Sequence, residues 1–209
     1  MFVTGLVLAA GASRRLGQPK QLLPYRGATL LDATLSVARS CGFDQLLVAL
    51  GAASEQVRSA VHLGAVEVVE NPQYSTGCGS SIGAALSAVD ERAEGLVLLL
   101  GDQPGISPLA VARLIEDASS PMAVCRYDDS LGHPLWFRRD MFAELSHLHG
   151  DKAVWKLLTS GAYDVRELLV KGLVPVDVDT RQDYEVLVAG DQPRRSDHQP
   201  GHDRFRTQA

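Results

Sequence analysis

The chain has 209 residues and a formal net charge of −5, with 45% hydrophobic and 22% charged residues. That length suits one large domain and is short for two. The negative charge and the lack of a long Lys/Arg stripe argue against a protein that binds duplex DNA or an anionic membrane surface. No apolar run is long enough to cross a bilayer, and no signal-like segment precedes the first strand, so we expect a cytoplasmic protein.

Apolar runs bounded by turn residues recur along the chain, with helix-like stretches between most of them. This alternation predicts an α/β fold. Runs such as Leu96–Leu100 are apolar throughout, which favours strands covered on both faces by helices and therefore a mostly parallel sheet. The predicted strands are Leu6–Ala10, Gln45–Leu50, Val66–Glu70, Leu96–Leu100, Met122–Cys125 and Val174–Val178.

Capping residues locate several helices. Apolar residues recur at helical spacing over Leu30–Cys41, and Gly42 then offers a left-handed stop. Ser107 predicts an N-cap, because the proline that follows it suits the first helical position of a helix over Pro108–Ala118. Further ends are predicted at Asp151 and Thr180, as N-caps, and at Gly161, as the stop of the Asp151 helix.

The last twenty residues differ in composition from the rest. They hold one aromatic residue and no aliphatic residue larger than alanine, so they cannot bury enough surface to become ordered. We predict a single domain over residues 1–189 and a flexible polar tail over residues 190–209.

The three cysteines are an odd number with no spacing that suits zinc or a redox dithiol. We interpret them as reduced thiols. Cys41 and Cys125 are expected in or near the core, whereas Cys78 follows a glycine in a loop and is expected nearer the surface.

The segment from Leu8 to Lys20, LAAGASRRLGQPK, carries the strongest functional signal. A short apolar strand runs into a loop in which Gly11 and Gly17 can adopt conformations closed to other residues, so main-chain N–H groups can turn toward phosphate oxygens. Arg15 and Lys20 would neutralise the phosphate charge, while Arg14 is expected to be exposed. An ordinary polar turn is the alternative interpretation.

Two familiar phosphate-binding motifs do not fit this loop. A Walker loop needs Lys followed by Ser or Thr directly after its second glycine, and here Gln18 and Pro19 precede Lys20. A dinucleotide fingerprint needs glycines where Ser13 and Leu16 stand.

The loop resembles the signature of the MobA-like nucleotidyltransferase superfamily, Leu-Ala-(Ala or Gly)-Gly-x-Ser-x-Arg-x-Gly-x-x-Lys. The matching positions are Leu8, Ala9, Ala10, Gly11, Ser13, Arg15, Gly17 and Lys20. The resemblance continues through GDQP at 101–104, LGHPLWF at 131–137, GDKA at 150–153 and VDVDTRQDY at 176–184, and covers residues 6–188. It implies a three-layer, Rossmann-like nucleotidyltransferase fold.

Asp102 follows the apolar strand Leu96–Leu100, so its carboxylate should lie at the edge of the sheet where open α/β sheets bind ligands. A lone Asp there can also be a turn residue or a helix cap. The resemblance assigns Asp102 to Mg²⁺, a hard cation that prefers carboxylate and phosphate oxygens.

Asp177 and Asp179 lie two residues apart on a predicted strand, which would place both side chains on one face. The resemblance implies that Asp179 supplies a second metal contact, whereas Asp177 is expected to be solvated or structural. The alternative for the pair is a solvent-facing edge that leads into the helix capped by Thr180.

By the same resemblance, Leu8, Ala9, Ala10 and Gly11 would line the nucleotide site together with Arg15, Lys20 and Asp102. Ser80 and Ser81 would cap a helix or touch the ribose and base. His133, in the Gly-His-Pro element, would shape the pocket of the second substrate.

The function implied is transfer of a nucleoside monophosphate from its triphosphate to a phosphate-bearing acceptor, with pyrophosphate released. The resemblance is closest to molybdenum cofactor cytidylyltransferases, which implies CTP rather than GTP, Mg²⁺ as cofactor, a molybdopterin-type acceptor and a possible molybdoenzyme partner. Ala10 supports a pyrimidine, because guanylyl-transferring relatives usually have glycine there and a methyl group narrows the pocket.

Two alternatives remain open. The Asp177-Val178-Asp179 element has the Asp-x-Asp form used by nucleotide-sugar-dependent glycosyltransferases, although it lies late in the chain. The protein could also be a non-catalytic molybdenum cofactor-binding maturation protein. The sequence leaves the acceptor and the oligomeric state undetermined.

Overall fold

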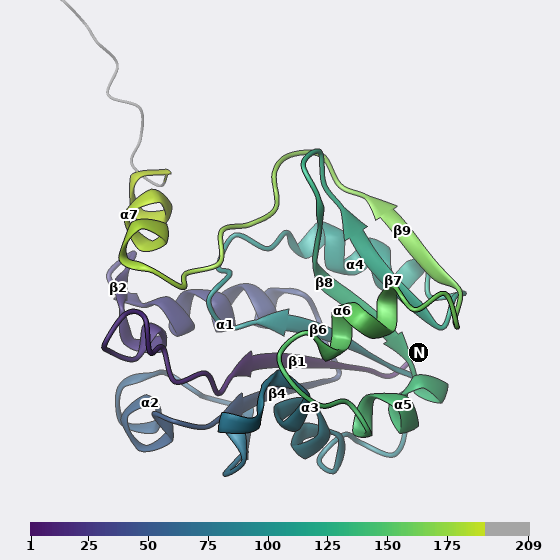
Figure 1. Ribbon diagram of the computed structural model, residues 1–209, viewed down its shortest axis with the longest axis horizontal. Coiled ribbons are helices and arrows are strands. Elements are labelled where there is room, and N and C mark those ends of the chain that lie inside the picture. The colour runs from purple at the N-terminus through teal and green to yellow at the C-terminus, as the bar shows by residue number, and fades with distance from the viewer. Residues whose placement is uncertain (191–209) are drawn as a thin grey trace, which may run out of the picture.

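The computed structural model describes residues 1–190, and the predicted tail lies outside them except for Gly190. Seven strands form one sheet in the order β5-β4-β1-β6-β8-β7-β9 (Figure 1). Every adjacent pair is parallel except the two that involve β8. The strands are β1 Val3–Ala9, β4 Gln45–Leu50, β5 Glu67–Glu70, β6 Gly95–Leu100, β7 Met122–Arg126, β8 Leu131–Arg138 and β9 Val165–Leu169, with a separate hairpin of β2 Pro24–Tyr25 and β3 Ala28–Thr29.

Helices cover both faces of this sheet, which confirms the predicted three-layer, Rossmann-like α/β fold (Figure 1). The α-helices are α1 Leu30–Ser40, α2 Ser54–Ala60, α3 Cys78–Leu86, α4 Pro108–Glu116, α5 Phe142–Ser146, α6 Ala153–Leu158 and α7 Arg181–Gly190. Short 3-10 helices occupy η1 Lys20–Leu22, η2 Tyr74–Thr76 and η3 Arg139–Met141.

The central strands bury both of their faces, because successive side chains point to opposite sides of the sheet. In β6, Val97 and Leu99 pack in a core shared with α1, α2 and α4. Leu96 and Leu98 pack in a second core, shared with α3, α5 and α6. The uninterrupted apolar run of the sequence therefore serves two cores at once.

Strand β8 was not predicted from the sequence, because its Gly132 and Pro134 are residues that usually break strands. In the structure, Val124 of β7 pairs with Leu135 and Cys125 pairs with Gly132. The two β8 residues between Gly132 and Leu135 therefore form a bulge and have no partner on β7. The proline thus occupies a place where the sheet needs no N–H donor.

The predicted strand Val174–Val178 is wrong. Residues 173–179 form an extended segment outside the sheet, and β9 pairs with β7 at the edge instead. Side chains replace a strand partner here, since the Val174 N–H donates to Asp129 and the Pro175 carbonyl accepts from Gln103.

Most predicted helix ends are close to those observed. Gly42 follows α1 with a φ of 72°, Ser107 caps α4, and Thr180 and Asp183 exchange hydrogen bonds at the start of α7. Asp151 is not an N-cap of its own helix, because α6 begins at Ala153. Its carboxylate accepts the N–H of Cys78 at the start of α3, a contact that joins residues 73 positions apart.

All three cysteines are free, and the one in β7, Cys125, is buried. Burial raises the pKa of the Cys41 thiol to about 11 and that of Cys125 to about 12, so both stay protonated near neutral pH. Among residues 1–190, none of the helices has both the length and the apolar character that crossing a membrane requires.

Candidate functional site

The loop after β1 turns sharply at two positions with positive φ. Ser13 adopts a φ of 51° and Gly17 one of 68°. The Ser13 side chain accepts the N–H of Lys20 at 3.0 Å, and its carbonyl accepts the N–H of Leu16 at 3.0 Å. These bonds close the loop on itself and bring Lys20 back toward the end of β1. Arg14 and Arg15 are exposed on the loop.

Gln21 holds the start of this loop by hydrogen bonds, although no sequence motif singles it out. Its side chain is buried, and its Nε2 donates to the carbonyls of Ala9 at 2.6 Å and Gly11 at 3.1 Å. Both carbonyls are therefore turned toward Gln21. Its position beside Lys20 was the one available signal, because nothing in the sequence shows which way a glutamine points.

Lys20 lies at the centre of a charged network that joins three distant segments. Its Nζ is 2.6 Å from Oδ2 of Asp102 and 2.9 Å from Oδ1 of Asp179. Arg15 reaches the other oxygen of Asp179 at 2.6 Å. The side chains of Lys20 and Asp102 are 19% and 8% exposed, whereas those of Asp179 and Arg15 are 44% and 67% exposed. The loop after β1 and two carboxylates from later segments thus meet at one point.

The pKa values of Lys20 and Asp179 follow from this network. Burial by itself would lower the pKa of Lys20, but the charge of Asp102 and the hydrogen bonds to both carboxylates raise it overall. Burial would raise the pKa of Asp179, but its contacts with Lys20 and Arg15 lower it overall. Both groups are therefore charged near neutral pH.

Asp177 shares the same cavity as Asp179 although the predicted strand is absent. Extended backbone alternates its side chains, so Val178 points the other way and is fully buried. Partial burial and the neighbouring charge of Asp102 raise the pKa of Asp177 to about 6. Its carboxylate accepts a hydrogen bond from Gln103.

Two adjoining cavities of about 260 and 340 Å³ open around this network. The first is lined by predicted nucleotide-site residues, namely Leu8, Ala9, Ala10, Gly11, Lys20, Ser81 and Asp102, and the second by Arg15. Gly11, Lys20, Tyr74, Asp151 and Asp179 line both cavities, so they form one continuous depression.

Ser80 does not line either cavity. Its hydroxyl shares its one hydrogen between the carbonyls of Gln73 and Gly77 and accepts from Asn71, so its hydrogen bonds hold the start of α3. Ser81 is buried and accepts from the same Asn71 side chain at 3.0 Å. The two serines thus have different surroundings.

His133 is also outside these cavities. Its ring packs edge-on against Trp155 with centroids 5.7 Å apart, and its carbonyl accepts the hydroxyl of Tyr127. Burial lowers the pKa of His133 to about 4, so the ring is neutral near neutral pH.

The start of α3 forms the wall of these cavities that faces the loop after β1. Gly77 has a φ of 109°, and a side chain there would come within 2.5 Å of the Gly150 backbone. Tyr74, Cys78 and Asp151 line this wall. Tyr74 and Asp151 were not predicted in the site from the sequence, because only the folded chain brings residue 151 against residue 78.

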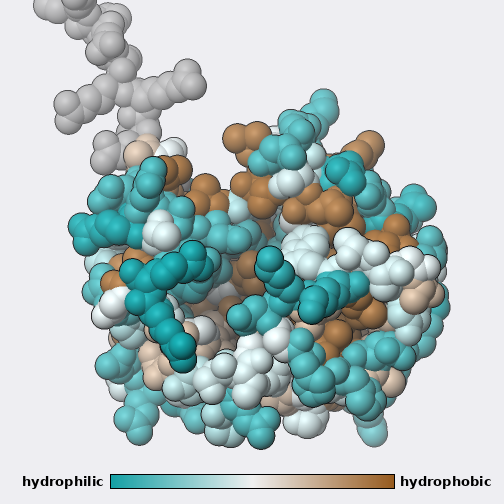
Figure 2. Space-filling view, viewed as in Figure 1, coloured by the Kyte–Doolittle hydropathy of each residue, from teal (hydrophilic) through white to brown (hydrophobic). Residues whose placement is uncertain are grey.

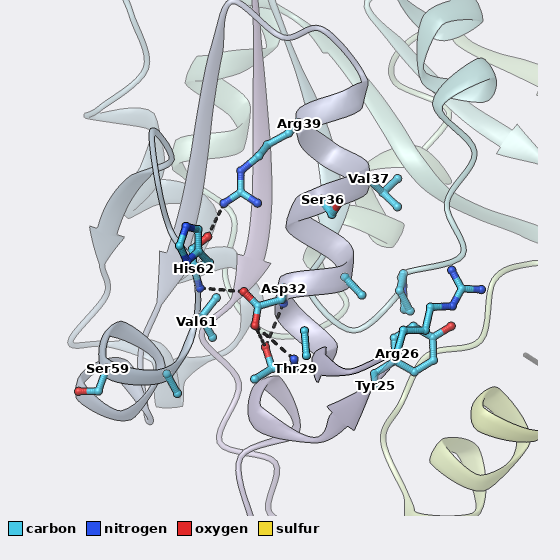
Figure 3. A pocket seen from close by; sticks show the side chains of 14 residues that line it. Tyr25, Arg26, Thr29, Asp32, Ser36, Val37, Arg39, Ser59, Val61 and His62 are labelled. Atoms are coloured by element: carbon cyan, nitrogen blue, oxygen red, sulfur yellow. Dashed lines mark hydrogen bonds between the residues drawn. The ribbon is translucent and has the colours of Figure 1, made fainter.

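A larger cavity lies elsewhere, between α1 and α2, with a volume of about 780 Å³ (Figure 3). Its polar groups are engaged in local structure. Asp32 accepts from Thr29 in the capping box of α1 and from the N–H of His62, while Arg39 donates to the His62 carbonyl (Figure 3). In the two smaller cavities, by contrast, Lys20 and Arg15 contact carboxylates from distant segments of the chain.

Within residues 1–190, no group of three or more His, Cys, Asp or Glu side chains is arranged to hold a metal ion. Asp102 and Asp179 nevertheless converge on one cation, the ammonium group of Lys20. Mg²⁺ is commonly held by one or two carboxylates, with water and phosphate oxygens completing its shell. The donor set therefore fits a divalent cation that arrives with a phosphate ligand.

Comparison with known proteins extends this picture. A family model of the MobA-like NTP transferase domain matches residues 5–166. Purine catabolism protein PucB of Bacillus subtilis is 30% identical over 198 residues, 89% of this chain and 96% of that protein. Nicotine blue oxidoreductase of Paenarthrobacter nicotinovorans is 41% identical over 114 residues, and the match spans 54% of this chain and only 55% of that protein.

Solved structures of Rv0371c from Mycobacterium tuberculosis H37Rv are also similar. One is 53% identical with a TM-score of 0.85, and the match covers 90% of this chain and 97% of that chain. Another, a complex with manganese, is 50% identical with a TM-score of 0.81, over 90% of this chain and 99% of that chain.

Proposed function

The chain belongs to the MobA-like NTP transferase family, and from this premise we propose that it transfers CMP from CTP to a phosphate-bearing acceptor, with release of pyrophosphate. The observation that carries the proposal is the meeting of Lys20 with both Asp102 and Asp179 in the cavity beside Gly11. This arrangement gathers an ammonium group that could bind phosphate oxygens and two carboxylates that could bind a cation at the edge of one cavity.

The cationic groups serve the phosphates. Lys20 lines both cavities, and Arg15 and Arg14 line the second. An ammonium group and guanidinium groups neutralise phosphate charge and orient its oxygens. The hydrogen bonds from Gln21 satisfy the Ala9 and Gly11 carbonyls, which would otherwise repel an incoming anion.

Asp102 and Asp179 are the residues that would hold Mg²⁺. When bound, the cation neutralises charge that develops on the phosphates, which is worth several kcal/mol in related chemistry. Manganese in one Rv0371c structure is consistent with a divalent cation in this family. Lys20 would then exchange carboxylate oxygens for phosphate oxygens, since both are anionic acceptors.

The chemistry asks little else of the protein. An acceptor phosphate oxygen attacks the α-phosphorus of CTP, a bond forms between them, and the bond from the α-phosphorus to the bridging oxygen breaks as pyrophosphate leaves. The acceptor phosphate is already ionised near neutral pH, so no general base is needed. In this proposal Lys20 and Arg15 accelerate the transfer by positioning the phosphates and stabilising their negative charge.

CTP is preferred over GTP in this proposal because Ala10 lines the first cavity with a methyl group. One methyl group contributes only about 1–3 kcal/mol of discrimination, so other residues of the cavity must add to it. Ser81 is placed to do so, because it lines the same cavity and Ser80 does not.

Molybdopterin is the proposed acceptor, and a molybdoenzyme the proposed recipient of the product. The support is the MobA-like family match. His133 would act on the acceptor side only by shaping the wall with Trp155, because its neutral ring lies outside both cavities.

The two alternatives are less well supported. In the Asp-x-Asp interpretation both carboxylates would hold a metal, but here Asp177 is bound to Gln103 and only Asp179 contacts Lys20. A non-catalytic carrier needs a pocket but not the paired charges of Lys20 and Asp102.

The test is a panel of nucleoside triphosphates with Mg²⁺ and either purified molybdopterin or a sugar phosphate as acceptor, with pyrophosphate measured over time. We expect pyrophosphate release that needs both CTP and the acceptor. Faster release with GTP would overturn the base assignment, and release only with a sugar phosphate would overturn the acceptor. An enzyme that produces no pyrophosphate with any pair would contradict the transferase proposal.

A further inference from the structure

Gln103 directly follows Asp102 and is almost fully enclosed, with 1% of its surface exposed. Its Nε2 donates two hydrogen bonds across the chain, one to the carbonyl of Pro175 at 3.0 Å and one to the carboxylate of Asp177. The side chain therefore joins the Asp102 loop to a segment more than seventy residues later. It does not line either cavity of the site.

The segment that it holds has little other support. After β9 the chain crosses the edge of the sheet toward α7 as an extended stretch without a strand partner (Figure 1). Its ends are fixed by the Val174 N–H on Asp129 and by the Asp179 N–H on Asp183. Between these ends, Gln103 makes all the polar contacts that the structure describes for residues 175–178, and Val178 packs in a small apolar cluster.

The orientation of the Gln103 amide is determined by its neighbours. The Pro175 carbonyl and the Asp177 carboxylate are both acceptors, so only the NH₂ end of the amide can face them. The Oε1 end is buried without a described partner. Glutamate has the same shape but no donor, and it would place a second negative charge beside Asp177.

We propose that Gln103 is a positioning residue that holds segment 175–178 against the Asp102 loop and thereby sets where Asp179 meets Lys20. One loop would then carry both the first carboxylate, Asp102, and the tether for the second. The geometry of the proposed cation and triphosphate site would depend on a side chain that touches neither. The consequence for catalysis rests on the proposed function, but the tether itself is independent of any ligand.

The test compares Gln103→Glu with Gln56→Glu, which makes the same change of charge at an exposed position of α2. Hydrogen exchange of the unliganded proteins, followed by mass spectrometry, reports the tether. We expect exchange of the Val174 and Asp179 amides, which donate to Asp129 and Asp183 at the two ends of the segment, to increase at least about tenfold in Gln103→Glu, because the stretch between them loses its hydrogen bonds to residue 103. Gln56→Glu should match the wild type.

Electron paramagnetic resonance of Mn²⁺ in the presence of CTP reports the consequence. We expect the affinity of Gln103→Glu for Mn²⁺ in the presence of CTP to be about 10- to 100-fold lower than that of the wild type. The global melting transition should remain cooperative. Adding Asp177→Asn should recover part of this loss, because the asparagine amide can donate to the new glutamate. A merely structural role for Gln103 would not produce such a partner-specific recovery.

Unchanged exchange at residues 173–180 in Gln103→Glu would overturn the inference, whether or not the protein binds nucleotide. Increased exchange with unchanged Mn²⁺ and CTP affinity would also overturn it, because the tether would then not position Asp179. If the wild type tethers the segment but transfers no nucleotide, the proposed function fails and the positioning role stands.

Discussion

Two cavities of this protein differ in size and in how their polar groups are used. The groove between α1 and α2 is the larger, at about 780 Å³, but Asp32 and Thr29 there complete the capping box of a helix (Figure 3). The depression at the carboxyl edge of β1 and β6 is smaller, yet Lys20 and two carboxylates meet in it. Convergent charge, and not volume, therefore marks the candidate site.

Figure 2 shows hydrophilic and hydrophobic surface closely mixed on the face drawn there, so no single large patch of either kind singles out a site on that face. The assignment therefore depends on the contacts of individual side chains. Substitutions in the two cavities should separate catalysis from stability, with the largest effect expected at Asp102 and the smallest at Asp32.

Asp102→Asn should have the largest effect. The variant keeps the shape of the side chain but removes the charge that pairs with Lys20 and that would hold the cation. We expect kcat for CTP turnover to fall about 10²- to 10³-fold, as when a single group that stabilises transition-state charge is lost. Pyrophosphate release measures it, and circular dichroism controls for folding. Turnover within about threefold of the wild type would remove Asp102 from the site.

Lys20→Met should lower kcat/KM about 100-fold, because a buried charge-assisted contact to the phosphates is lost. It should also strengthen Mn²⁺ binding in the absence of nucleotide, since the cation would no longer compete with an ammonium group between Asp102 and Asp179. Spin-resonance titration without CTP measures this second effect. Weaker Mn²⁺ binding in the variant would contradict the shared position of the two cations.

Ala10→Gly should change selectivity rather than rate. Removing the methyl group widens the first cavity and should shift the ratio of kcat/KM values toward GTP by about tenfold, within the range that one methyl group commands. Parallel assays with CTP and GTP measure it. An unchanged ratio of kcat/KM values would mean that other residues select the base, and Ser81 would be the next residue to substitute.

Asp32→Ala should have the smallest effect, and on stability alone. It removes the capping box of α1 and the acceptor of the His62 N–H, at a cost of about 1 kcal/mol in the free energy of unfolding. The hydrogen bonds lower the pKa of Asp32, so its contribution is present above an unfolded pKa of 3.8 and is lost as pH falls through the folded value. Denaturant unfolding at pH 7 and pH 3 measures this. Loss of CTP turnover in this variant would undo the contrast between the two cavities.

The sequence determined much of the frame of this protein. Largely apolar runs predicted five of the seven strands of the main sheet. A strand buried on both faces, such as β6, leaves no polar position, whereas β5 at the edge has an exposed glutamate at each end. Gly42, Ser107 and Thr180 predicted helix ends, since caps depend on local backbone geometry. The match at Leu8 to Lys20 and at Asp102 identified the family and its candidate residues.

The remaining features depend on contacts between segments that are far apart in the chain. An extended stretch becomes a strand only if a neighbouring strand has unpaired backbone N–H and C=O groups for it. At β7 these groups pair with β9 and not with residues 174–178. A polar side chain acquires its role from groups far away in the chain, as Asp151 does at the start of α3 and Gln103 does on Asp177. Hydrogen bonds and ion pairs act over a few ångströms, and no local pattern records which distant segments folding brings within that range.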